Sequence, residues 1–70
     1  MDTRYLYPFS PGSGPSYFVQ EQFVYEMSGS PAFFIDDDTL YTMTGKPTYW
    51  ISEGTVYDYS RPAKAVFYFA

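Results

Sequence analysis

The sequence predicts an all-β protein of four β-hairpin repeats arranged with pseudo-fourfold symmetry and without a helix. A short motif recurs at a spacing of 16 residues, which is the signature of a repeated supersecondary unit. Short runs rich in aromatic and β-branched residues alternate with Gly-, Pro- and Asp-containing turns, and no segment has helical periodicity. Since a lone hairpin is unstable in water, we expect four hairpins to share one core, as a flower or a miniature closed barrel.

The repeat is clearest in the middle of the chain, where residues 24–31 lie over residues 40–47 with Tyr, Met, Gly and Pro in common. We predict a single domain, residues 1–70, with repeats at approximately 3–19, 21–35, 37–51 and 53–69. The first copy has two extra residues, placed within 11–14. The fourth is aligned by removing one residue before Pro62, and its second half, residues 63–69, fits two registers.

Each unit begins with a short strand in which an aliphatic residue precedes a Tyr. A polar residue, or Pro8 in the first copy, comes next and is followed by Phe, Met or Tyr. The pattern has period-two character and high β propensity. We expect the aliphatic and Tyr positions to pack in the core; they are Leu6, Val24, Leu40 and Val56, and Tyr7, Tyr25, Tyr41 and Tyr57. In the two central copies a Ser/Thr-Gly-x-Pro turn follows, with Gly supplying a positive φ and Pro fixing the exit.

The second strand of each unit is aromatic, and a polar or acidic turn closes the unit. Neighbouring residues of a strand face opposite sides, so one aromatic of each adjacent pair should point inward and the other outward. Seventeen aromatic residues in a chain of 70 exceed what so small a core can hide. We therefore predict a partner or ligand surface among Tyr17, Phe18, Phe33, Phe34, Tyr49 and Trp50. The apolar tail, residues 66–69, either closes the ring against the first copy or docks on another chain.

Carboxylates recur at the turn between units, with Glu21, Asp37 and Glu53 each four residues before a Tyr and Asp2 five before Tyr7. Fourfold symmetry would place these four residues in an acidic rim at one end. We favour a role in solubility, although such a ring could also hold a cation or meet a basic partner. Asp36, Asp37 and Asp38 are weak candidates for a divalent cation site, and a solvated turn is the favoured interpretation.

The composition excludes several kinds of chemistry. The chain has no Cys and no His, which removes disulfides, the common zinc sites and the Ser-His-Asp and Cys-His arrangements. No phosphate-cradling Gly motif occurs, and a hydrolase built on paired carboxylates needs a cleft for which 70 residues leave little room. We therefore expect a protein that is not an enzyme and that has no cofactor.

The charge and hydropathy patterns bear on partners and location. A net charge of −4 with only four cationic side chains argues against nucleic acid. No run of 18 apolar residues and no basic segment followed by an apolar one is present, so we expect no membrane span, no signal peptide and a cytoplasmic location.

The pattern Leu/Val-Tyr-x-Met-Ser/Thr-Gly-Lys/Ser-Pro, followed by aromatics with Ile and an acidic turn, resembles the small bacterial 4-fold beta flower proteins. The resemblance covers residues 23–66 well and residues 4–19 loosely, and the Pro-Gly-Ser-Gly-Pro insertion of the first copy departs from it. It implies four short hairpin repeats and no established activity. Short tyrosine-containing β-repeats of the WG type are a second, weaker match.

We therefore predict a small non-enzymatic structural or protein-interaction module that associates with itself, or with another protein, through exposed aromatics. The alternatives are a small-ligand or carbohydrate binder that uses stacked Tyr and Trp faces at the axis, and a cation site at the acidic rim.

Overall fold

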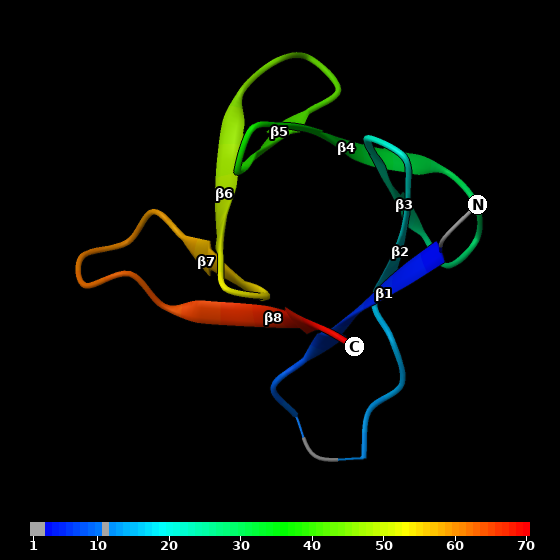
Figure 1. The fold of residues 1–70 in the computed structure, drawn as a ribbon, viewed down its shortest axis with the longest axis horizontal. Coiled ribbons are helices and arrows are strands. Elements are labelled where there is room, and N and C mark those ends of the chain that lie inside the picture. Colours follow the sequence, from blue (N-terminus) through cyan, green and yellow to red (C-terminus); the bar gives the residue numbers. More distant parts are fainter. Residues whose placement is uncertain (1–2, 11) are drawn as a thin grey trace.

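The structure, a computed structural model, describes residues 3–10 and 12–70. These residues form eight antiparallel strands joined in chain order into a closed barrel, with no helix among them. No segment in this part of the chain is a helix long and apolar enough to cross a membrane. The predicted all-β, fourfold hairpin architecture is thereby confirmed (Figure 1). The strands are β1 (Thr3–Pro8), β2 (Tyr17–Gln20), β3 (Phe23–Glu26), β4 (Pro31–Asp36), β5 (Thr39–Thr42), β6 (Pro47–Ser52), β7 (Thr55–Asp58) and β8 (Ala65–Phe69).

Pairing of β1 with β8 closes the barrel, with Leu6 opposite Phe69 and Pro8 opposite Phe67. The apolar tail therefore takes the first of its two predicted roles and closes the ring against the first copy. Closure removes the exposed edges that would otherwise pair with other chains. It also brings β1 beside β8, so that Arg4 and Phe69 line the same pocket.

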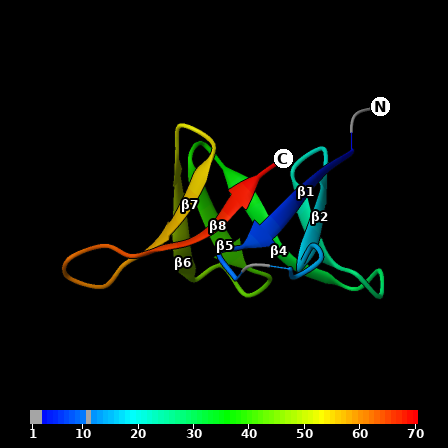
Figure 2. The same cartoon turned by 90° about the horizontal axis from the view of Figure 1, so that it is seen from below.

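The two ends of the barrel differ in their connections (Figure 2). At one end, which we call the turn end, two-residue turns join β2 to β3, β4 to β5 and β6 to β7. At the other, the loop end, longer loops follow β1, β3, β5 and β7 and spread outward from the barrel. The molecule is accordingly flat, with principal extents of 33 × 32 × 19 Å.

A register shift recurs at the same place in three of the four hairpins, between the aliphatic residue and the Tyr of the first strand. Such bulges increase the local twist and bend the strand, which helps a short sheet to close. Beyond the shift, Pro31 lies opposite Tyr25 and Pro47 opposite Tyr41. A residue without an N–H is tolerated at the first position of a strand.

The fourth hairpin corrects our alignment. Ala65 lies opposite Tyr57, which is the place that Pro31 and Pro47 hold in the central copies. The fourth copy therefore gains two residues where we had removed one, and Pro62 belongs to its loop. This register is the one that turns Phe67 inward and pairs it with Val56.

The core consists of residues at equivalent repeat positions. Leu6, Val24, Leu40 and Val56 form its fully buried centre. Burying such a side chain contributes about 1.5–3 kcal/mol, so these four supply much of the stability of so small a chain. Two further sets of four pack against this centre, Val19, Ile35, Ile51 and Phe69 on the side of the turn end, and Tyr17, Phe33, Tyr49 and Phe67 on the side of the loop end.

The Tyr that follows each buried aliphatic residue is not in the core, contrary to our expectation. Adjacent residues of a strand face opposite sides of the sheet, so burial of the aliphatic set turns these four Tyr side chains outward. There each stacks on an aromatic ring of a neighbouring strand.

Candidate functional site

The predicted aromatic surface divides between the two sides of the barrel wall. Tyr17, Phe33 and Tyr49 pack against the core, whereas Phe18, Phe34 and Trp50 lie on the outer surface. The outer rings are stacked on Tyr25, Tyr41 and Tyr57 with centroid distances of 5.1, 5.2 and 4.4 Å, and Tyr7 stacks on Tyr68 at 5.6 Å. One face of each outer ring is thus already occupied.

The inward aromatic rings form a closed cycle on the side of the loop end. Tyr17, Phe33, Tyr49 and Phe67 follow one another edge to face, with centroid distances between neighbours of 5.8, 5.6, 6.0 and 5.4 Å. This is a favourable aromatic geometry. Burial, followed by the charges of Tyr49 and Glu26, raises the pKa of the Tyr17 hydroxyl. Each ring of this cycle therefore packs against two of the others.

A set of exposed apolar residues lies at the start of the loops. Phe9, Met27, Met43 and Tyr59 are 55%, 49%, 48% and 53% exposed, and each stands two positions after the Tyr of its repeat. Our sequence reasoning placed this column in a strand and left it out of the candidate surface. The Ser/Thr-Gly turn motif of the central copies is the signal that could have identified this column. The Gly29 N–H donates a hydrogen bond to the Glu26 carbonyl, and the Gly45 N–H donates one to the Thr42 carbonyl, both of 2.8 Å. Each turn therefore places its Met just outside the strand.

Three of the four residues of the predicted acidic rim lie at the turn end. Glu21, Asp37 and Glu53 each open a two-residue turn, with φ of 57°, 56° and 51°, and all three are exposed. Asp2 lies outside the described residues. Asp36 and Asp38 flank Asp37 and are also exposed, but no three carboxylates of the described chain converge as metal ligands would.

Charge is therefore divided between the two ends. Among the described residues, the turn end carries five carboxylates and one Arg, a formal charge of −4. The loop end carries two carboxylates against Lys46, Arg61 and Lys64, a formal charge of +1. Two molecules of this chain therefore repel each other most strongly when their turn ends meet.

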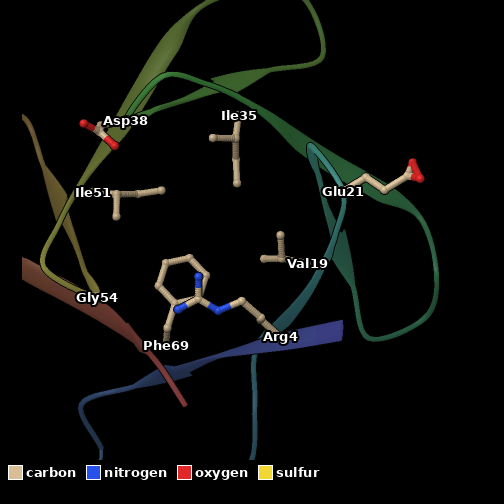
Figure 3. A pocket seen from close by; sticks show the side chains of 8 residues that line it. All are labelled: Arg4, Val19, Glu21, Ile35, Asp38, Ile51, Gly54 and Phe69. Carbon is tan, nitrogen blue, oxygen red and sulfur yellow. The ribbon is translucent and has the colours of Figure 1, made fainter. Parts of the chain in front are cut away.

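A pocket of about 290 Å3 opens at the turn end, into the mouth of the barrel (Figure 3). Its floor is apolar and consists of Val19, Ile35, Ile51 and Phe69. Arg4 reaches over this floor, with its guanidinium carbon 4.0 Å from the centre of the Phe69 ring, a cation–π contact. In the figure the Asp38 carboxylate lies across the mouth from Arg4, and Glu21 points away from it. Sequence reasoning missed this site because closure of the barrel creates it.

We compared the chain with protein-family models, with curated proteins and with solved structures, and found no match in any of the three. The functional argument therefore rests on the geometry of the two ends.

Proposed function

We propose that this protein is a small, non-enzymatic interaction module that associates with a second copy of itself through its loop end. The observation that carries the proposal is the set of exposed apolar side chains at equivalent loop positions, Phe9, Met27, Met43 and Tyr59. Large apolar side chains left in water at equivalent positions of all four loops favour a partner that covers them.

A second copy suits this surface better than an unrelated partner. The four side chains repeat with the pseudo-fourfold arrangement of the barrel, and another molecule of the chain presents the same arrangement in return. Pairing of like surfaces gives a closed dimer and does not extend into a filament. Contact through the weakly positive loop ends also keeps the strongly negative turn ends of the two molecules apart.

Sedimentation equilibrium at protein concentrations of about 10–100 μM tests the proposal. We expect the wild-type chain to populate a dimer, and the fraction of dimer to rise with ionic strength because salt screens the net charge of −4. The double variant Met27→Ser/Met43→Ser removes apolar contact area and should weaken association about tenfold or more.

The matched control is Met27→Leu/Met43→Leu, which keeps the apolar character of both loops and should dimerise like the wild type. Because both positions are exposed, neither pair of substitutions disturbs the core. A strict monomer at every concentration, or equal dimerisation of the Ser and Leu variants, contradicts the proposal.

We further propose kinship with the 4-fold beta flower proteins that the repeat motif resembles. The closed barrel of eight antiparallel strands is compatible with a flower of four hairpins and so supports the proposal. Sequence searches seeded with residues 23–66 test this kinship. We expect them to recover other chains that carry the motif in four copies. Recovery of chains with only two or three such copies counts against it.

A further inference from the structure

The mouth of the barrel breaks the fourfold symmetry that the rest of the chain keeps. The residue two positions before each buried aliphatic residue is Arg4, Gln22, Asp38 or Gly54 in the four repeats. Equivalent backbone positions thus carry a cation, a neutral amide, an anion and no side chain. The core beneath them is aliphatic or aromatic throughout, so it gives no reason for this divergence.

The two charges face each other across the mouth. Arg4 belongs to β1 and Asp38 precedes β5, four strands away in a ring of eight, so they stand on opposite sides of the barrel (Figure 3). Both line the pocket, and within the described chain they form no ion pair with each other. A molecule between them would meet a guanidinium on one side and a carboxylate on the other.

The rim is held in place before any ligand arrives. The Asp38 carbonyl accepts a hydrogen bond of 2.7 Å from the Ile51 N–H, and the Gly54 carbonyl accepts one of 2.9 Å from the Phe69 N–H. These bonds tie each turn to the next hairpin. The contact with the Phe69 ring directs the Arg4 guanidinium over the pocket. A site ordered in advance loses less freedom on binding.

From this arrangement we propose that the mouth binds a small zwitterion with a short aliphatic body, the chemistry of a free aliphatic amino acid. The ligand carboxylate pairs with Arg4, its ammonium group faces Asp38, and its aliphatic part lies on Val19, Ile35 and Ile51. A volume of about 290 Å3 is at the small end for ligand pockets and suits a molecule of this size. The site is at the opposite end from the loop surface, so it does not depend on self-association.

The test is a titration of the full-length, 15N-labelled protein with L-valine, followed by two-dimensional NMR. We expect saturable shifts at the amides of Gly54 and Ile51, with weaker binding of isobutylamine and isovalerate, which each carry one of the two charges. Arg4→Gln and Asp38→Asn should each weaken L-valine binding about tenfold, because each removes one charge-assisted hydrogen bond.

The matched control is Asp37→Asn, which removes a charge from the same turn at a residue that does not line the pocket. The affinity for L-valine should then change by no more than about twofold, as expected when a distant, screened charge is removed. Arg4→Lys, which keeps the charge, checks that loss in Arg4→Gln does not come from misfolding. The proposal is overturned if L-valine gives no saturable shifts, if it binds no more tightly than the two singly charged probes, or if Asp37→Asn weakens binding as much as Asp38→Asn does.

Discussion

At the scale of single residues, the two-residue turns contain a conflict between sequence and backbone. Glu21, Asp37 and Glu53 adopt φ between 51° and 57°, a region in which a non-Gly residue costs about 1–2 kcal/mol. Asn and Gly are the usual residues of such hairpin turns. From sequence we predicted the place of these carboxylates and their common end, but not their strained backbone, because nothing in the residue type Glu indicates a left-handed conformation.

We predict that Glu21→Asn stabilises the protein by about 0.5–1 kcal/mol, since Asn tolerates this conformation better than Glu does. Glu21→Gln is the matched control, because it removes the same charge and keeps the unfavourable backbone preference. Urea unfolding measures both. Equal midpoints for the two variants would show that charge, and not the backbone, limits this turn.

At the scale of elements, the hairpin pattern was predictable and the loop lengths were not. The alternation of inward and outward aromatics in β2, β4 and β6 follows from the sequence, since burial of one face fixes the register of a strand. The fourth loop misled the alignment because Pro62 imitates the Pro that begins β4 and β6. In the fold, the Asp58 carboxylate organises this loop by accepting hydrogen bonds from the backbone N–H groups of Ser60 and Lys64, at 3.1 and 3.0 Å.

These bonds make the β7–β8 loop sensitive to acid. The hydrogen bond from the Ser60 hydroxyl, with those from the Lys64 and Ser60 N–H groups, lowers the pKa of the Asp58 carboxyl below its ordinary value of 3.8. The resulting stabilisation is fully present at pH values above that ordinary value. It disappears as the pH falls through the lowered pKa of the folded state.

We predict that amide exchange at Ser60 and Lys64 is protected at neutral pH after correction for the intrinsic exchange rate, and that this protection is lost in strong acid. In Asp58→Asn the same amides should be poorly protected at every pH, because a neutral amide oxygen is a weaker acceptor than a carboxylate. Undiminished protection of these amides in Asp58→Asn would show that the carboxylate does not order the β7–β8 loop.

At the scale of the whole molecule, closure of the ring creates both proposed sites. Pairing of β1 with β8 sets Arg4 over Phe69, residues at opposite ends of the chain, and so assembles the mouth pocket. The antiparallel strand order places the turns at one end and the loops at the other, which among the described residues separates a charge of −4 from one of +1. The repeat predicted an acidic end, but the pocket depends on a contact between distant segments that no local pattern encodes.

If two copies meet through their loop ends, as we propose, three Gly amides report on this contact directly. Gly29 and Gly45 lie in the loops after β3 and β5, and Gly54 lies in a turn at the opposite end. An NMR concentration series of the wild-type protein should move or broaden the Gly29 and Gly45 signals and leave Gly54 unchanged. Signals that do not depend on concentration, or changes confined to Gly54, would contradict the claim.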